Sequence, residues 1–143
     1  MDTLIYFVLE AITIIIVTTL FEYMKAFLST IQGDTVPKSM GRLTLNPVKH
    51  FEPIGFLLFL YSGYGWANPV ETSSRNYKDK KTGTIITYLV PIIVFIILAV
   101  LIKIIMNIVM VANNGAMMYL NVFLAHLSRN LAAVAVFNII PVY

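Results

Sequence analysis

Cysteine is absent from this 143-residue sequence, and charged residues are scarce. Without cysteine the chain has no disulfide, no thiolate metal site and no cysteine nucleophile. Charged residues make up 12% of the chain and hydrophobic residues 59%, so there are too few polar side chains to cover a soluble domain or to keep the chain disordered. The composition therefore indicates a membrane protein.

Several signatures of soluble enzymes are also missing. The sequence has no phosphate-binding glycine loop, no Gly-x-Ser-x-Gly elbow and no EF-hand loop. The net charge is only +3, and the basic residues neither share one predicted face nor alternate with aromatic residues. We therefore expect membrane lipid and other membrane proteins as partners, and no nucleic acid.

Long apolar runs dominate what is present. They predict an all-α membrane protein, a single integral membrane domain over residues 1–143, with transmembrane helices at about 3–32, 84–112 and 116–140. A signal peptide is the alternative for the first run, but the acidic Asp2, the length of the run and the lack of a small-residue cleavage pattern favour a span. An Asn-Asn-Gly turn signal separates the second and third runs.

The basic residues predict the orientation of the chain. Eight of the ten lie from Lys25 to Lys81, and the turn between the second and third spans has none. The positive-inside rule then places the loop at about 33–83 and the C-terminus in the cytoplasm, and the N-terminus outside.

Residues 51–67 form an apolar stretch that glycine and proline interrupt. The stretch is too short for a comfortable span, so we predict a re-entrant or interfacial segment that packs against the helices. Four aromatic residues in or near it suit the headgroup level, although such side chains also simply pack: Tyr61, Tyr64, Trp66 and Tyr77.

The most specific pattern lies between residues 33 and 70. Its residues are Gly33, Asp34, Gly41, Arg42, Leu43, Thr44, Leu45, Asn46, Pro47, His50, Pro53, Ile54, Gly55, Gly65, Trp66, Ala67, Pro69 and Val70. This pattern resembles that of the bacterial site-2 proteases, a family of intramembrane zinc metalloproteases with GD, GRLTLNP, HIDPIG and GWAKPV sequences, with Glu52 in place of the usual Asp. The sequence FNIIP, which contains Asn138 and Pro141, resembles the family's FNLLP. The resemblance implies a site-2-protease-like core in a bacterial cytoplasmic membrane.

The family's zinc-binding sequence is His-Glu-x-x-His on a helix, in which two imidazoles bind the metal and the Glu is the general base. The resemblance places this motif on residues 21–25, where only Glu22 matches, because the two ligand positions hold Phe21 and Lys25. Phenylalanine has no ligand atom, and a lysine ammonium has no lone pair. The third ligand is an Asp expected shortly after FNIIP, and the sequence ends at Tyr143. We therefore predict a remnant general base and no cofactor.

Glu22 and Lys25 stand at positions i and i+3 of one helix. An ion pair there would supply the positive charge that zinc otherwise provides; alternatively, Lys25 extends to the membrane interface. The family's second core helix commonly opens with an AGP…N pattern, and residues 88–95 lack both the small residues and the Asn. This departure puts a contact between that helix and the active-site helix in doubt.

Three other charges lie inside the predicted spans. Glu10 and Lys103 could neutralise each other, or else reach separately for the interface or a partner. Arg129 lies midway along the third span, and we expect it to meet a carboxylate, a carbonyl or another subunit. His126 stands alone on its helix, and His50 is expected to hold the loop by hydrogen bonding. A zinc site rebuilt from His50, His126 and Glu22 is conceivable, although nothing in the spacing requires it.

These observations favour a pseudoprotease that binds a membrane partner as a regulatory or structural subunit, in a hetero-oligomer. The first alternative is an active intramembrane metalloprotease with a rebuilt or truncated zinc site. The second is a small transporter or channel component, suggested by the charges within the spans. Fold alone does not decide among these functions.

Overall fold

The computed structural model describes residues 3–109 and 115–140. These residues form six α-helices and one 3₁₀-helix, and the described ranges contain no strand. In chain order the elements are α1 (Thr3–Ile31), α2 (Val36–Ser39), α3 (Pro47–His50), α4 (Pro53–Ser62), η1 (Ser74–Asn76), α5 (Lys80–Val109) and α6 (Gly115–Phe137). The predicted end of the second span at 112, the two asparagines of the turn signal and Pro141 lie outside the described residues.

Three of the helices are long and apolar enough to cross a membrane, over Thr3–Ile31, Lys80–Ile108 and Met117–Phe137. At 1.5 Å of rise per residue, each is at least as long as the hydrocarbon core of a bilayer, which is about 30 Å thick. The prediction of an all-α membrane protein with three transmembrane helices is confirmed.

α5 begins at Lys80, earlier than the predicted start at residue 84. The cause is Asp79, whose carboxylate accepts hydrogen bonds from the backbone N–H groups of Lys81 and Thr82 and from the Thr82 hydroxyl. An aspartate at this position supplies acceptors for N–H groups that have no partner within the helix. The helix then continues through Pro91, which is buried.

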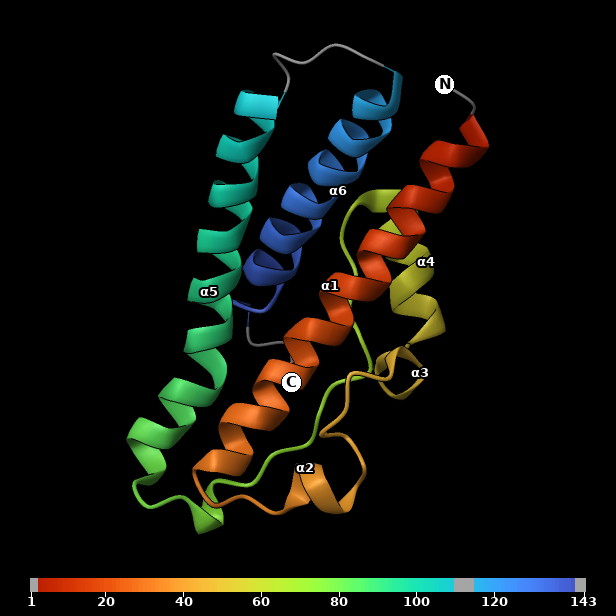
Figure 1. Cartoon of the computed structure of the whole chain (residues 1–143). Helices are drawn as coiled ribbons and strands as arrows, with labels where there is room; N and C mark the ends of the chain where they lie inside the picture. Colours follow the sequence, from red (N-terminus) through yellow and green to blue (C-terminus); the bar gives the residue numbers. More distant parts are fainter. Residues whose placement is uncertain (1–2, 110–114, 141–143) are drawn as a thin grey trace.

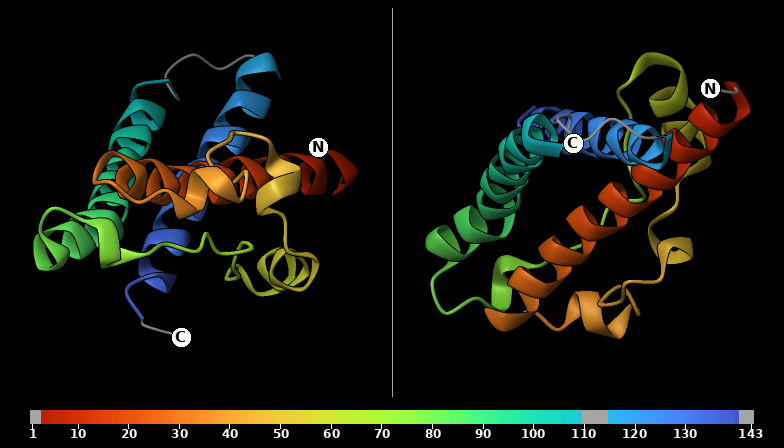
Figure 2. Two further views of the ribbon diagram at one scale, coloured as in Figure 1. Left: turned by 90° about the horizontal axis from the view of Figure 1, so that it is seen from below. Right: turned by 45° about the horizontal axis from the view of Figure 1, so that its top comes forward.

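α5 and α6 lie side by side, and α1 crosses them, as Figures 1 and 2 show. The core between the three helices is apolar, and each helix contributes to it: Ile14, Val17 and Phe21 from α1, Ile92, Phe95 and Ala99 from α5, and Leu131, Val134 and Ala135 from α6. The short helices α2, α3 and α4 lie along α1, away from α5 (Figure 1). After α4 the chain runs in an extended conformation past α1 to reach α5.

The stretch at 51–67 contains α4, a ten-residue apolar helix. The Glu52 side chain accepts hydrogen bonds from the backbone N–H groups of Ile54 and Gly55, Pro53 occupies the first turn, and the helix ends at Gly63 with φ of 78°. Phe59 packs into the core, whereas Ile54, Leu57, Leu58 and Tyr61, at helical spacing, are exposed. The depth of α4 in a membrane stays a prediction.

Candidate functional site

The centre of the candidate site is on α1, where Phe21, Glu22 and Lys25 are all buried. Lys25 Nζ lies 3.2 Å from both Oε1 and Oε2 of Glu22, so the ion pair expected from their spacing forms. Lys25 is only 2% exposed. The alternative in which Lys25 extends to the membrane interface is therefore wrong. We call Glu22 and Lys25 the within-helix pair.

α5 covers this part of α1 with aromatic side chains. The rings of Phe21 and Phe95 meet edge to face with centroids 5.0 Å apart, and Lys25 Nζ lies 5.6 Å from the centroid of the Tyr88 ring. An ammonium near an aromatic face gains electrostatic stabilisation. The doubt about a contact between this helix and α1 was unfounded, because bulky rings bridge the distance that small residues were expected to close.

A second group approaches Glu22 from the extended segment after α4. The Val70 backbone N–H donates to Glu22 Oε2 at 2.7 Å. Both carboxylate oxygens of Glu22 thus have close partners, one shared between Lys25 and Val70. Buried carboxylates need such donors to offset the loss of water.

A cavity of about 350 Å³ opens beside the within-helix pair. Trp66 stacks on Phe137 at one edge, with centroids 6.1 Å apart and planes at 19°. This contact joins the loop motif that contains Trp66 to the C-terminal FNIIP motif, which begins at Phe137. The cavity, which we call the pair cavity, is lined by Glu22, Lys25, Trp66, Ala67, Pro69, Phe137, Asn138 and Ile140.

The residues of the within-helix pair do not fit a zinc ion. Phe21 offers no ligand atom, and the Lys25 ammonium occupies the side of Glu22 that a cation would need. Within the described ranges, no three His, Cys, Asp or Glu side chains are grouped so that they could hold a metal. The rebuilt site from His50, His126 and Glu22 is therefore not formed by the described residues.

Asp34 of the loop motif is almost fully buried, and it ties three segments together. Its Oδ2 accepts from the Ser29 hydroxyl at 2.6 Å and from the Ser73 N–H at 2.7 Å, and its Oδ1 accepts from the Val36 N–H at 2.9 Å. Gly33, with φ of 110°, makes the turn that brings Asp34 back to α1; a side chain there would also collide with the Asn76 carbonyl.

Tyr77 extends this buried network to α5. Its hydroxyl lies 2.7 Å from Ser29 Oγ and 3.0 Å from Thr87 Oγ1. Gln32 also donates to Thr87 Oγ1, at 2.9 Å. Tyr77 is therefore a packed residue and not a headgroup-level aromatic, whereas Tyr61, Tyr64 and Trp66 are exposed.

Arg42 and His50 hold the loop closed. Arg42 Nη2 donates to the Asn68 carbonyl at 2.6 Å and lies 3.3 Å from that of Pro69. His50 Nε2 lies 2.9 Å from the Thr44 carbonyl, and the Asn68 N–H donates to the His50 carbonyl at 2.9 Å. The backbone between these contacts is thereby fixed next to Glu22. Burial lowers the pKa of His50 below its usual 6.5.

Four further motif residues fix the local conformation of the backbone. Asn46 caps α3, since its side chain accepts from the Val48 N–H at 3.1 Å, and Pro47 occupies the first turn. At Gly55 an added Cβ would lie 2.2 Å from the Trp66 carbonyl oxygen, so only glycine allows α4 to approach the extended segment. Gly41 has φ of 65°, in the left-handed region that favours glycine.

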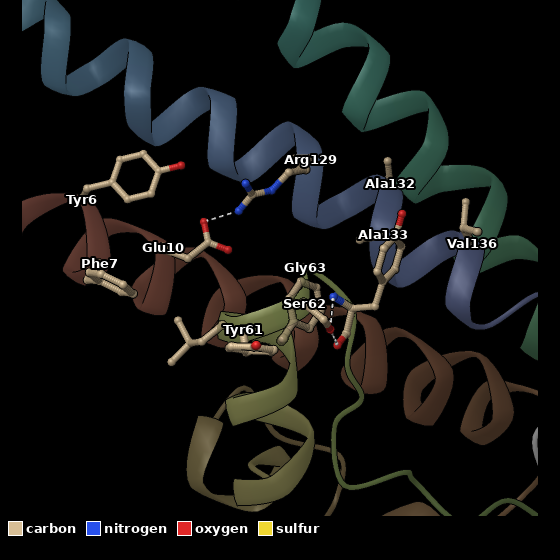
Figure 3. A pocket seen from close by; sticks show the side chains of 13 residues that line it. Tyr6, Phe7, Glu10, Tyr61, Ser62, Gly63, Arg129, Ala132, Ala133 and Val136 are labelled. Atoms are coloured by element: carbon tan, nitrogen blue, oxygen red, sulfur yellow. Dashed lines mark hydrogen bonds and ion pairs between the residues drawn. The ribbon is translucent and has the colours of Figure 1, made fainter. Parts of the chain in front are cut away.

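A second polar group joins α1 to α6. His126 Nδ1 and Arg129 Nη2 both contact Glu10 Oε2, the latter at 2.5 Å (Figure 3). Asn130 Nδ2 donates to Thr13 Oγ1 at 2.9 Å and reaches Glu10 Oε1 at 3.3 Å. We call Glu10, Thr13, His126, Arg129 and Asn130 the cross-helix cluster.

The cross-helix cluster corrects two expectations. Glu10 pairs with Arg129 and not with Lys103, which lies on α5 with its side chain exposed. His126 is not alone, because it contacts Glu10 and lies 3.2 Å from Arg129 Nη2. The expected carboxylate partner of Arg129 is Glu10. Figure 3 shows the ion pair of Arg129 with Glu10, and both residues line a cavity of about 640 Å³ between α1, α4 and α6.

Sequence reasoning missed Asn130, Thr13 and the Ser29–Tyr77–Thr87 chain of hydroxyls. Asn130 and Thr13 carried no motif, and their partners are more than a hundred positions away. The one available signal was a polar residue on an otherwise apolar helix, which membranes tolerate when it finds a hydrogen-bond partner.

No protein-family model matches the chain, and no solved structure matches it. The sequence is similar to a protein of Bacillus subtilis (strain 168) described as "Putative zinc metalloprotease YwhC". The two are 38% identical over 86 residues, which cover 57% of this chain and 39% of the relative. The chain thus spans well under half of that relative's length. The similarity supports the site-2-protease-like family that the loop motifs indicate.

Proposed function

We propose that this protein is a catalytically inactive, site-2-protease-like membrane protein that binds a segment of a membrane partner without cleaving it. The observation that carries the proposal is the buried contact of Lys25 Nζ with both oxygens of Glu22. Lys25 stands at the position where the family resemblance implies the second zinc-binding histidine.

The chemistry of peptide hydrolysis by this family depends on a metal-bound water and a free general base. Glu22 is not free, because Lys25 and the Val70 N–H both donate to its carboxylate. These donors occupy the carboxylate oxygens that a general base must present to a water molecule. The within-helix pair therefore supports loss of hydrolysis on this helix.

The surroundings of the pair support binding. The pair cavity remains open beside Glu22, and the motif residues Arg42, His50 and Gly55 still hold the extended segment that lines it. A cavity of about 350 Å³ is large enough for a few side chains of an extended or unwound segment. Such a segment of a partner, in a hetero-oligomer, is the occupant that we propose.

Crosslinking from the pair cavity tests this binding. A photoreactive residue in place of Ile140, which lines the cavity, should give a discrete protein adduct in membranes of the source organism. The same residue in place of the exposed Ile104 of α5 is the matched control and should give a different adduct pattern or lipid alone. Ala67→Phe, which fills the cavity, should abolish the Ile140 adduct. An adduct at Ile140 that Ala67→Phe leaves unchanged would contradict the proposal.

Zinc content tests the loss of hydrolysis separately. Protein purified without a metal-binding tag should contain far less than one zinc per chain by elemental mass spectrometry. One zinc per chain, lost on Glu22→Gln, would show instead that the site holds metal and would overturn the proposal that the protein is catalytically inactive.

We further propose that the loop at 33–83 faces the cytoplasm and that the N-terminus and residues 113–115 face outward, as the distribution of basic residues supports. Because the chain has no cysteine, single substitutions report orientation cleanly. In intact bacterial cells an impermeant maleimide should label Asn114→Cys and leave Lys78→Cys unlabelled until the cells are lysed. The reverse pattern would invert the topology.

A further inference from the structure

Among the described residues of the three long helices, the two glutamates of α1 each pair with a cation. Glu22 pairs with Lys25, and Glu10 pairs with Arg129. Lys80 and Lys81 begin α5 next to the loop, where water is close. Apart from these two lysines at the start of α5, Lys103 is the one cation among the described residues of the long helices that has no ion pair.

Lys103 lines a groove between α5 and α6. The groove has a volume of about 400 Å³, and we call it the α5–α6 groove. At its floor the Ser128 hydroxyl donates to the Ala99 carbonyl at 2.9 Å, which holds the two helices close together. The half-exposed side chain of Arg129 reaches the same groove. The lining is Ala99, Val100, Lys103, Met106, Ala125, Ser128, Arg129 and Ala132.

We propose that the α5–α6 groove receives a transmembrane helix of a partner protein whose Asp or Glu pairs with Lys103. A charged side chain inside a bilayer is costly unless it finds a partner or reaches the interface. The small side chains of Ala125, Ser128 and Ala132 allow another helix to approach α6 closely, as membrane helix contacts require. The groove therefore combines an unpaired positive charge with a surface shaped for a helix.

Two other occupants are less suited to the groove. A second copy of this chain offers no free carboxylate within its spans, because Glu10 and Glu22 already have cationic partners. An anionic lipid headgroup lies at the interface and needs no small-residue surface along the helices. The proposal rests on the proposed function only in assuming a membrane partner, since the α5–α6 groove shares no residue with the pair cavity.

Synthetic transmembrane peptides test the proposal. The probes are Leu/Ala peptides of about 20 residues with a single Asp or, as the uncharged counterpart, a single Asn. Energy transfer to a fluorophore on Met118→Cys in phosphatidylcholine vesicles measures binding; Met118 is exposed, and the chain has no other cysteine. We expect the Asp peptide to bind about tenfold more tightly than the Asn peptide, as one charged interhelical contact allows.

Two variants locate the effect. Lys103→Met should remove the preference for Asp. The double variant Lys103→Leu, Ile104→Lys keeps a lysine at nearly the same depth and turns it to another exposed face of α5, so it should remove the preference as well. A preference that survives in either variant would overturn the proposal, as would equal binding of both peptides to the wild-type protein.

The remaining outcomes identify the other occupants. If about 30% phosphatidylglycerol abolishes the preference for Asp, then Lys103 is held by anionic headgroups and the proposal fails. If labelled copies of the chain associate without peptide and Lys103→Met prevents this, the occupant is a second copy and the proposal also fails. Crosslinking from Ile140 and the zinc content report on the pair cavity alone, so failure here is distinguishable from failure of the proposed function.

Discussion

The within-helix pair and the cross-helix cluster differ in where the cation beside a buried glutamate comes from. Each buries a glutamate of α1, and each neutralises it with a cation. In the pair the cation comes from the same helix, one turn away, whereas in the cluster it comes from α6, more than a hundred positions along the chain. The two side chains of the pair are 3% and 6% exposed, whereas the Arg129 side chain of the cluster is 51% exposed.

This difference separates an ion pair that stabilises one helix from an ion pair that stabilises the docking of two helices. A local pair forms whenever the helix forms, so it stabilises α1 without fixing its neighbours. A pair between helices forms only when α1 and α6 are docked, so it contributes to the specificity of that docking.

Lys25→Met should have the largest effect on stability. It leaves Glu22 buried with one backbone donor and no cation, and a buried charge without a partner costs about 3 kcal/mol of the free energy of unfolding. Denaturant unfolding in mild detergent measures this loss. Lys103→Met is the matched control, because the same substitution at an exposed lysine should change the free energy of unfolding by no more than about 0.5 kcal/mol. Equal losses in the two variants would show that Glu22 does not depend on Lys25.

Glu10→Gln should cost less, about 2 kcal/mol, since Arg129 is half-exposed and can turn toward water or headgroups when its carboxylate is removed. The same unfolding measurement applies. A loss greater than that of Lys25→Met would reverse the order and make the cross-helix cluster the dominant site.

The double variant Glu22→Gln, Lys25→Met should recover most of the loss seen for Lys25→Met. It removes both charges together and leaves an amide that the Val70 N–H can still reach, so we expect a net loss of about 1 kcal/mol. The double-mutant cycle then gives the coupling energy of the pair. If the two substitutions are additive, the pair contributes no coupling.

The pH dependence through His50 should be the smallest effect. Burial lowers its pKa in the folded state below the usual 6.5, so the unfolded chain binds the proton more readily. Stability from this group is complete above pH 6.5 and falls as the pH drops from there, by about 1 kcal/mol or less at pH 5.5. Unfolding of the wild-type protein and of His50→Gln between pH 7.5 and 5.5 measures the difference. The same slope in the wild-type protein and in His50→Gln would contradict this prediction.

The i and i+3 spacing of Glu22 and Lys25 predicted their contact, because residues at this spacing share one face of a helix. The Asn46-Pro47 and Glu52-Pro53 pairs begin α3 and α4, and these helix starts were not predicted although a side-chain acceptor followed by proline is a local signal for them. Between helices, the expected carboxylate partner of Arg129 was found, but its identity was not predicted. One alternative paired Glu10 with Lys103, whereas Glu10 contacts Arg129. Similar depth along two spans does not specify which faces of the two helices meet.

The amino-acid sequence was enough to predict a three-helix membrane protein, and it has Phe21 and Lys25 at the positions where the family resemblance implies zinc-binding histidines. Composition decides the first because only lipid accommodates such long apolar runs, and residue chemistry decides the second because neither side chain offers a lone pair. The tertiary structure alone decided that Lys25 is buried against Glu22, that Arg129 meets Glu10 and that Lys103 is left facing the α5–α6 groove. Burial and pairing across helices depend on how the helices are rotated and packed against one another. These rotations are fixed only when all three helices are in contact.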